Sequence, residues 1–212
     1  MPAQSDETMV QMREQKRTLR REMLERRRVF SPEERRRASE IVRTRTAELP
    51  EVQAAKTVML YASTPEEVDL FPLIEVLLRT GKRVALPYIV GKGHMEARLL
   101  LTVEELVAGA YGILTPDPAR REIISPEEID VVIVPGAAFA EDGGRLGLGG
   151  GYYDRFLPRT AGALRLVLAY DFQVIPEIPM APYDAYVDRI LTERRDIRPR
   201  RVRYDKTFEE EV

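Results

Sequence analysis

The sequence feature that most constrains the fold is the alternation, from Lys56 onward, of short apolar runs with amphipathic helical patterns. The clearest run is DVVIV at residues 130–134, which Pro135 and Gly136 end. A strand that is apolar at successive positions needs helices over both of its faces, and such strands belong to parallel sheets. We therefore predict an α/β fold of three layers, with a mostly parallel central sheet flanked by helices.

Further strands and helices are expected on either side of this run. Asp69 is expected to cap a helix that Gly81 ends, and the box Thr102–Glu105 is expected to open a short helix to Ala108. The other expected strands span residues 57–61, 83–88, 95–101, 164–170 and 186–191.

The N-terminal part, residues 1–50, predicts a pair of basic helices. Residues 13–45 hold 13 basic and 6 acidic side chains, which makes this part an attractor for anions. The second helix is expected to begin after Ser31, because Ser31, Pro32 and Glu34 together form the pattern of a capping box with proline in the first turn.

Length and composition limit the remaining possibilities. The 212 residues favour one domain over 1–212, and the charged segment 194–212 is expected to be a mobile tail. The chain has no cysteine, which excludes thiol chemistry. It has one histidine, His94, which we expect to be exposed in a loop, so a histidine-based triad or a histidine-rich metal site is not expected. No apolar run could cross a membrane and no signal peptide is visible at the N-terminus, so we expect a cytoplasmic protein with no membrane partner.

A glycine-rich run after the DVVIV strand is the candidate functional site. Six of the 13 glycines lie between Gly143 and Gly151, and a helix is expected to start near Tyr152. Such a loop predicts a cradle of backbone amides for phosphate, with Arg145 as a cation and Asp154 as a carboxylate suited to Mg²⁺. It is not a Walker loop, since no Gly-Lys-Ser/Thr follows. It is not a dinucleotide fingerprint either, because Tyr152 stands where the third glycine of that pattern would be, after Gly147 and Gly149. The alternative is a flexible, glycine-rich hairpin.

The order of motifs resembles the 5-formyltetrahydrofolate cyclo-ligase family, also called methenyltetrahydrofolate synthetases. The resemblance covers nearly the whole chain and rests most on the run RLGLGGGYYDRFL at residues 145–157. The other matching segments are Lys16-x-x-x-Arg20, Tyr61, residues 67–69 (EVD), Gly112-Ile113, residues 134–139 (VPGAAF), Phe172-Gln173 and residues 184–193 (DxxxDxxxTE).

The resemblance implies an ATP- and Mg²⁺-dependent enzyme. Members convert 5-formyltetrahydrofolate and ATP to 5,10-methenyltetrahydrofolate, ADP and phosphate. The γ-phosphoryl group moves to the formyl oxygen, the folate nitrogen at position 10 attacks the formyl carbon, and phosphate leaves. Such a reaction demands positioning and charge neutralisation more than a nucleophilic side chain.

Roles follow residue by residue from the resemblance. It implies Arg145 and Tyr152 as catalytic residues, Asp154 and Asp188 as ligands of Mg²⁺, and Glu67 as the partner of the pterin edge. The residues implied in ATP binding are Lys16, Arg20, Gly147, Leu148, Gly149, Gly150, Gly151, Tyr152 and Tyr153. Of these, Gly149, Gly150, Gly151, Tyr152 and Tyr153 would also border the folate.

Each of these residues has a structural alternative. Lys16 and Arg20 are also typical of a solvated basic face, and Glu67 of a first-turn carboxylate favoured by a helix dipole. Asp154 and Asp188 could be caps or surface ion-pair partners. Of Tyr152 and Tyr153, we expect one to contact ligand and the other to belong to the core.

Some positions depart from the family pattern, and they leave alternative functions open. The departures are Leu70, Leu114-Thr115, Ala140 and Ala181-Pro182-Tyr183. They keep open a diverged folate- or nucleotide-binding paralogue with little turnover. A nucleic-acid partner is not expected, because glutamates interrupt the basic run and no aromatic platform accompanies it. We expect a monomer whose partner is a small molecule, 5-formyltetrahydrofolate, with or without a polyglutamate tail.

Overall fold

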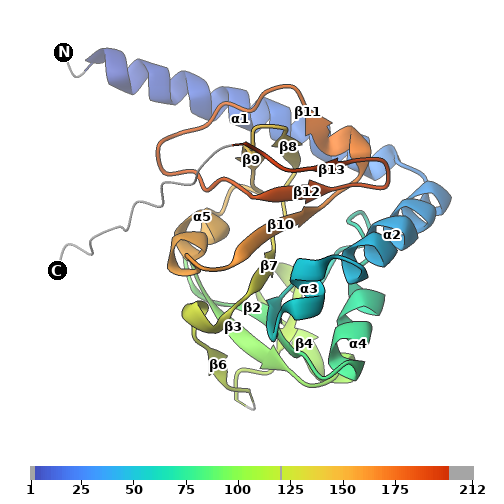
Figure 1. The fold of residues 1–212 in the computed structure, drawn as a ribbon. Coiled ribbons are helices and arrows are strands. Elements are labelled where there is room, and N and C mark those ends of the chain that lie inside the picture. Colours follow the sequence, from blue (N-terminus) through green and yellow to red (C-terminus); the bar gives the residue numbers. More distant parts are fainter. Residues whose placement is uncertain (1–2, 120, 201–212) are drawn as a thin grey trace.

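The protein is described by a computed structural model that covers residues 3–119 and 121–200 (Figure 1). Within these residues the main sheet has eight strands in the order β13-β12-β10-β7-β1-β2-β3-β6. Strands β12, β10, β7, β1 and β2 are mutually parallel, whereas β13, β3 and β6 are antiparallel to their neighbours. Their bounds are β1 (Thr57–Met59), β2 (Arg83–Gly91), β3 (His94–Leu100), β6 (Ile123–Ile124), β7 (Val131–Ile133), β10 (Leu164–Leu168), β12 (Arg189–Leu191) and β13 (Asp196–Ile197).

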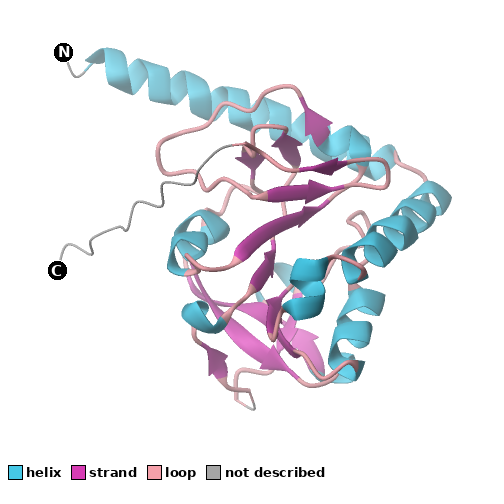
Figure 2. Cartoon of the chain, viewed as in Figure 1, coloured by secondary structure: helices cyan, strands magenta, loops and turns pink. Residues whose placement is uncertain are grey.

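Helices cover both faces of this sheet, as the apolar strands predicted (Figure 2). Side chains that alternate along the strands feed two cores: Val58 packs with α2, α3 and α4, whereas the next residue, Met59, packs with α5 on the opposite face. The fold is the expected three-layer α/β arrangement. The helices are α2 (Pro32–Ala47), α3 (Pro50–Ala54), α4 (Phe71–Arg79) and α5 (Tyr152–Phe156).

A long first helix and a small sheet lie at one end of the molecule (Figure 1). Helix α1 (Ala3–Val29) buries Met23 against Ala138 and Leu146 of this sheet, whose strand order is β11-β8-β9. With α2 it forms the expected N-terminal helical pair. The strands are β8 (Ala138–Ala140), β9 (Arg145–Leu146) and β11 (Val174–Ile175).

The predicted capping box of α2 is confirmed. Ser31 Oγ accepts from Glu34 N at 3.2 Å, and a Glu34 carboxylate oxygen accepts from Ser31 N at 3.3 Å. Because the capping residues act locally, the start of this helix could be found from sequence alone.

The helix expected at 102–108 is wrong. Thr102 caps only a short 3₁₀ turn (Val103–Glu105), and Leu106–Ala108 form strand β4, which pairs antiparallel with β5 (Leu114–Pro116). Glu105 accepts hydrogen bonds from Leu101 N and the Arg121 guanidinium. A helix of so few residues is costly to nucleate, and the hairpin instead satisfies the backbone through strand pairing.

Three further expectations need correction. Helix α4 begins after Leu70 rather than Asp69, and Asp69 instead accepts from Phe71 N at 3.2 Å. The tail expected from residue 194 is ordered at its start, because β13 pairs with β12 and Arg195 Nε donates to Asp171 at 2.7 Å. Residues 201–212 lie outside the described part of the chain. His94 is exposed as expected, but it is the first residue of β3 rather than part of a loop. In the described ranges, no helix combines the length and apolarity needed to span a bilayer.

Candidate functional site

A cavity of about 470 Å³ opens beside the carboxyl ends of β1 and β7. Tyr61 and Ala62 follow β1, and Pro135 follows β7, at the sheet edge where α/β proteins commonly bind ligands. The turn between β4 and β5, which holds Tyr111, and the glycine loop 147–151 form other walls. The lining residues are Tyr61, Ala62, Thr64, Glu67, Pro87, Ile89, Met95, Ala110, Tyr111, Ile113, Thr115, Pro135, Arg145, Gly147, Leu148, Gly150, Gly151, Tyr152, Tyr153 and Asp154.

The glycine loop needs glycine for two separate reasons. Gly149 and Gly151 have φ of +104° and +68°, which side-chain-bearing residues rarely adopt. At Gly150 a Cβ would lie 2.5 Å from the ring of Tyr152, and at Gly147 it would lie 2.8 Å from the guanidinium of Arg145. The loop is therefore a tightly fitted wall of the cavity, and the flexible-hairpin alternative is not supported.

Helix α1 brings two cations to this loop. Arg20 Nε donates to the carbonyl of Gly147 at 2.8 Å, and Lys16 forms an ion pair with Asp184. Burial lowers the pKa of Arg20, while the nearby carboxylates of Asp154 and Asp184 oppose that shift. The two residues are thus held among carboxylates at the glycine loop rather than on a freely solvated face.

Arg145 and Asp154 form an ion pair on the floor of the cavity. One terminal nitrogen of the buried Arg145 donates to Asp154 Oδ1, and the other donates to the carbonyl of Pro135 at 3.2 Å. Asp154 Oδ1 also accepts from Ala185 N at 3.1 Å. Asp154 Oδ2 accepts no hydrogen bond from the residues that the structure describes.

Glu67 lies buried at another side of the cavity. Its Oε2 accepts from Thr64 N at 2.8 Å, and its Oε1 lies 3.4 Å from Arg27 Nη1 of helix α1. It precedes α4 by several residues, so the first-turn alternative does not apply. Burial raises the pKa of Tyr61 well above its usual value, and the charge of Glu67 raises it further.

Polar atoms in the cavity wall lack partners. The Tyr153 hydroxyl and Thr64 Oγ1 are buried without a hydrogen-bond partner among the described residues. Burial also raises the pKa of Tyr153. Because buried polar groups are nearly always satisfied in native proteins, these atoms are available to water or to a polar ligand in the cavity.

Tyr152 and Tyr153 do not divide, as expected, into one residue that faces the ligand and one that belongs to the core. Both line it, and both pack against the core cluster around α5. The Tyr152 hydroxyl lies 3.2 Å from that of Tyr111, a residue with φ of +59° and 79% exposure. Leu148 also lines the cavity and is exposed.

Asp188 does not line the cavity. It precedes β12, and its Oδ2 accepts from the backbone amide of Arg165 on β10 at 2.8 Å. Asp184 instead lies at the site through its ion pair with Lys16. The departures from the family pattern fall in different places: Leu70 and Ala140 are core residues, Thr115 lines the cavity, and Tyr183 is exposed.

Sequence reasoning missed Asp184, Arg27 and Tyr111 as residues of this region. A signal existed for Arg27, which follows Arg20 by seven residues and therefore lies on the same face of the helix. No local pattern marked Tyr111, because its position depends on the pairing of β4 with β5, and β4 was expected to be the end of a helix.

Together the fold and the site define an α/β protein with a ligand cavity at the carboxyl edge of its sheet and a basic helix against a glycine loop. Residues 12–193 match the model of the 5-formyltetrahydrofolate cyclo-ligase family. The chain belongs to this family, as the motifs predicted.

Individual relatives agree with this assignment. The 5-formyltetrahydrofolate cyclo-ligase of Mus musculus is 32% identical over 189 residues, which cover 84% of this chain and 93% of that protein. The protein of the same name in Escherichia coli K12 is 34% identical over 172 residues, covering 79% and 94%. The solved structure of Aquifex aeolicus 5,10-methenyltetrahydrofolate synthetase superimposes with a TM-score of 0.79 at 38% identity, covering 93% of this chain and 99% of that chain.

Proposed function

We propose that this protein cyclises 5-formyltetrahydrofolate to 5,10-methenyltetrahydrofolate with ATP, releasing ADP and phosphate. Family membership supports the reaction type. The observation that carries the proposal is that helix α1 brings Arg20 to the carbonyl of Gly147 and Lys16 to Asp184, next to a cavity lined by the Arg145–Asp154 ion pair. Glu67 lines the same cavity.

The nucleotide phosphates are assigned to the glycine-loop side. Arg20 and Lys16 supply positive charge there, and the loop has no side chains at Gly149–Gly151 to keep a phosphate from its backbone. Burial strengthens such charge interactions because solvent screens them less. The folate is assigned to the rest of the cavity, where the Glu67 carboxylate can accept hydrogen bonds from the donor-rich edge of the pterin.

The chain contributes to the chemistry mainly by positioning and by charge. We assign to Arg145 the role of offsetting negative charge that develops as the phosphoryl group moves to the formyl oxygen, and to Tyr152 the role of orienting the reacting groups. Once that oxygen carries phosphate, the nitrogen at position 10 attacks the formyl carbon and phosphate leaves. This intramolecular attack needs the two folate nitrogens held together in a cavity that excludes water.

The donor set fits Mg²⁺ only in a phosphate-bridging form. Asp154 Oδ2 is available among the described residues, but no group of three or more histidine, aspartate or glutamate side chains gathers there to hold a metal. Mg²⁺ commonly binds one or two carboxylates together with phosphates and water. When bound, the ion would neutralise phosphate charge. Asp154 is the proposed ligand, and Asp188 stays a predicted second ligand.

The direct test measures absorbance of the methenyl product with and without ATP and Mg²⁺, together with ADP release. The proposal predicts product only when 5-formyltetrahydrofolate, ATP and Mg²⁺ are all present, and ADP release that depends on 5-formyltetrahydrofolate. Nucleotide hydrolysis without folate, or binding without turnover, would instead identify the diverged paralogue. The protein is further proposed to act as a monomer in the cytoplasm, which sedimentation and fractionation would check.

A further inference from the structure

One face of helix α1 contacts both the glycine loop and Glu67. Lys16, Arg20, Met23 and Arg27 follow at intervals of four, three and four residues, so they lie on one helix face. In this order they contact Asp184, the Gly147 carbonyl, the small sheet and Glu67. Eleven helical residues span about 16 Å, so a single rigid element reaches from the glycine loop to Glu67.

The contact between Arg27 and Glu67 is buried. The side chains are 9% and 7% exposed, in contrast to 77% for the neighbouring Arg28. Glu67 is also held by its backbone, since the Tyr170 hydroxyl donates to its carbonyl at 2.7 Å. Removing one member of a buried ion pair leaves an uncompensated charge, so loss of Arg27 would leave the Glu67 carboxylate without its buried counter-charge.

The geometry leaves the carboxylate able to bind a ligand. Thr64 N occupies Oε2, but Arg27 approaches Oε1 only to 3.4 Å. A charge-assisted hydrogen bond of full strength is shorter, about 2.7–2.9 Å. Oε1 can therefore accept a further donor, and Glu67 lines the cavity from which that donor would come.

We propose that Arg27 is a positioning residue that holds Glu67 for the folate, so that α1 serves both substrates along one face. The inference rests on the proposed function. Lys16 and Arg20 act at the nucleotide, whereas Arg27 acts through Glu67 at the folate, two helical turns further along. Loss of Arg27 should therefore weaken folate recognition selectively.

The test compares Arg27→Met, Arg27→Lys and the exposed control Arg28→Met in steady-state kinetics, with thermal unfolding of each. For Arg27→Met we expect a rise of tenfold or more in KM for 5-formyltetrahydrofolate and a change within twofold for ATP. Arg27→Lys, which keeps the charge, should recover part of the folate affinity. Arg28→Met should match the unsubstituted protein in both constants.

Other outcomes overturn the proposal. A normal folate KM in Arg27→Met, or equal rises for both substrates, would reduce Arg27 to packing. If Arg27→Met is unfolded at the assay temperature, Arg27→Lys decides, and a folate KM equal to that of the unsubstituted protein would count against the proposal. No turnover by the unsubstituted protein would overturn the proposed function and this inference together, whereas the former results overturn the inference alone.

Discussion

At the residue scale, the site depends on the absence of side chains at Gly149 and Gly150. Gly150 packs against the flat ring of Tyr152, and Gly149 adopts a backbone conformation closed to most residues. The glycine loop therefore contributes to the site through the shape of its backbone. This can be separated experimentally from general stability, because other glycines of the chain lie in open space.

We expect Gly150→Ala to lower kcat at least tenfold while the protein stays folded. The new methyl group would lie 2.5 Å from the Tyr152 ring and push it from its place in the cavity wall. Steady-state kinetics and circular dichroism measure the two effects. Gly162→Ala is the control, since nothing lies within 4 Å of its Cβ. Normal kcat in Gly150→Ala would mean that the Tyr152 ring has no part in the reaction.

Asp154→Asn tests whether the Asp154 carboxylate holds Mg²⁺. The change keeps the size of the side chain but removes the charge that would hold Mg²⁺, so we expect turnover to fall steeply and to recover in part at high Mg²⁺. Asp188→Asn behaves alike if Asp188 is a second ligand, and the double variant is then less than additive. A magnesium dependence unchanged in Asp188→Asn would assign Asp188 a structural role, to which its contact with the Arg165 amide contributes.

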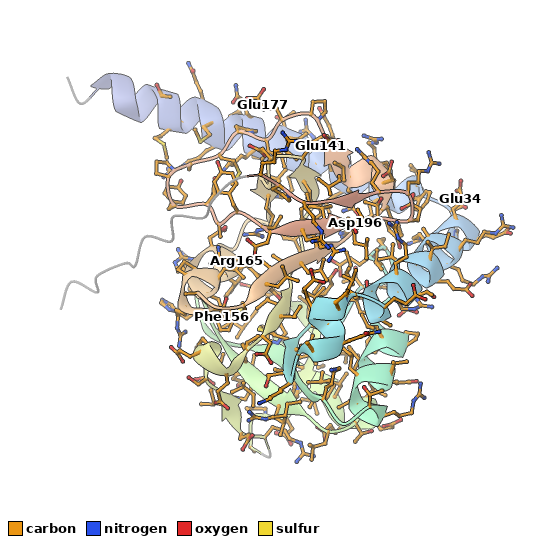
Figure 3. All side chains as sticks on the ribbon, in the orientation of Figure 1. Glu34, Glu141, Phe156, Arg165, Glu177 and Asp196 are labelled. Carbon is orange, nitrogen blue, oxygen red and sulfur yellow. The ribbon has the colours of Figure 1, made fainter. Side chains whose placement is uncertain are left out.

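At the element scale, α1 is bound to the body of the protein through functional side chains. Its contacts at Lys16 and Arg20 join residues 127 to 168 positions apart in the chain. The capping box of α2, by contrast, is local, and Glu34 stands at the outer end of that helix (Figure 3). The first helix thus serves the site, while the second covers the sheet.

Lys16→Ala and Arg20→Ala should each raise KM for ATP about tenfold or more, with a smaller effect on KM for folate. The reason is that a hydrogen bond to a charged group contributes roughly 1.5–3 kcal/mol, and tenfold in affinity is about 1.4 kcal/mol. Initial-rate kinetics with each substrate varied in turn measure this. Arg17→Ala is the control, because the Arg17 side chain is 75% exposed and, within the described part of the chain, pairs only with Glu14. Equal effects on both substrates would reduce the helix to a packing element.

At the scale of the whole molecule, ion pairs fasten the edge of the main sheet. Arg189 on β12 donates to both carboxylate oxygens of Asp196 on β13, at 2.8 and 2.6 Å, and to Glu51 of α3. The segment beyond residue 193 is therefore part of the fold as far as it is described.

This edge should be sensitive to acid. The hydrogen bonds from Arg189 lower the pKa of Asp196 below its ordinary value of 3.8. A lowered pKa contributes stability that is fully present above the ordinary value and is lost as the pH falls through the lowered one. We expect the unfolding temperature to drop as the pH falls below about 4. Asp196→Asn should lower the unfolding temperature at neutral pH but flatten this drop. Glu14→Gln is the control, because the Glu14 side chain is exposed on α1, and its unfolding temperatures should stay near those of the unsubstituted protein. If Asp196→Asn shows the same slope of unfolding temperature against pH as the unsubstituted protein, another group causes the acid sensitivity.

The sequence by itself determined whatever depends on neighbours in the chain. The apolar run 130–134 predicted a sheet buried on both faces, and Ser31 with Glu34 predicted a helix start, because periodicity and capping are local properties. The motif around the glycine loop identified the family. The hairpin at 106–116 was missed because strand pairing rather than local propensity decided it.

Only the tertiary structure decided which distant groups meet. Asp184 pairs with Lys16, Arg27 with Glu67, and Tyr111 with Tyr152, although nothing in their local sequence fixes these pairs. Ion pairs and shared cavities depend on packing of whole elements, which local propensities do not encode. The sequence therefore determined the layers, the loop and the family, while the fold decided that one face of α1 spans the site from Asp184 to Glu67.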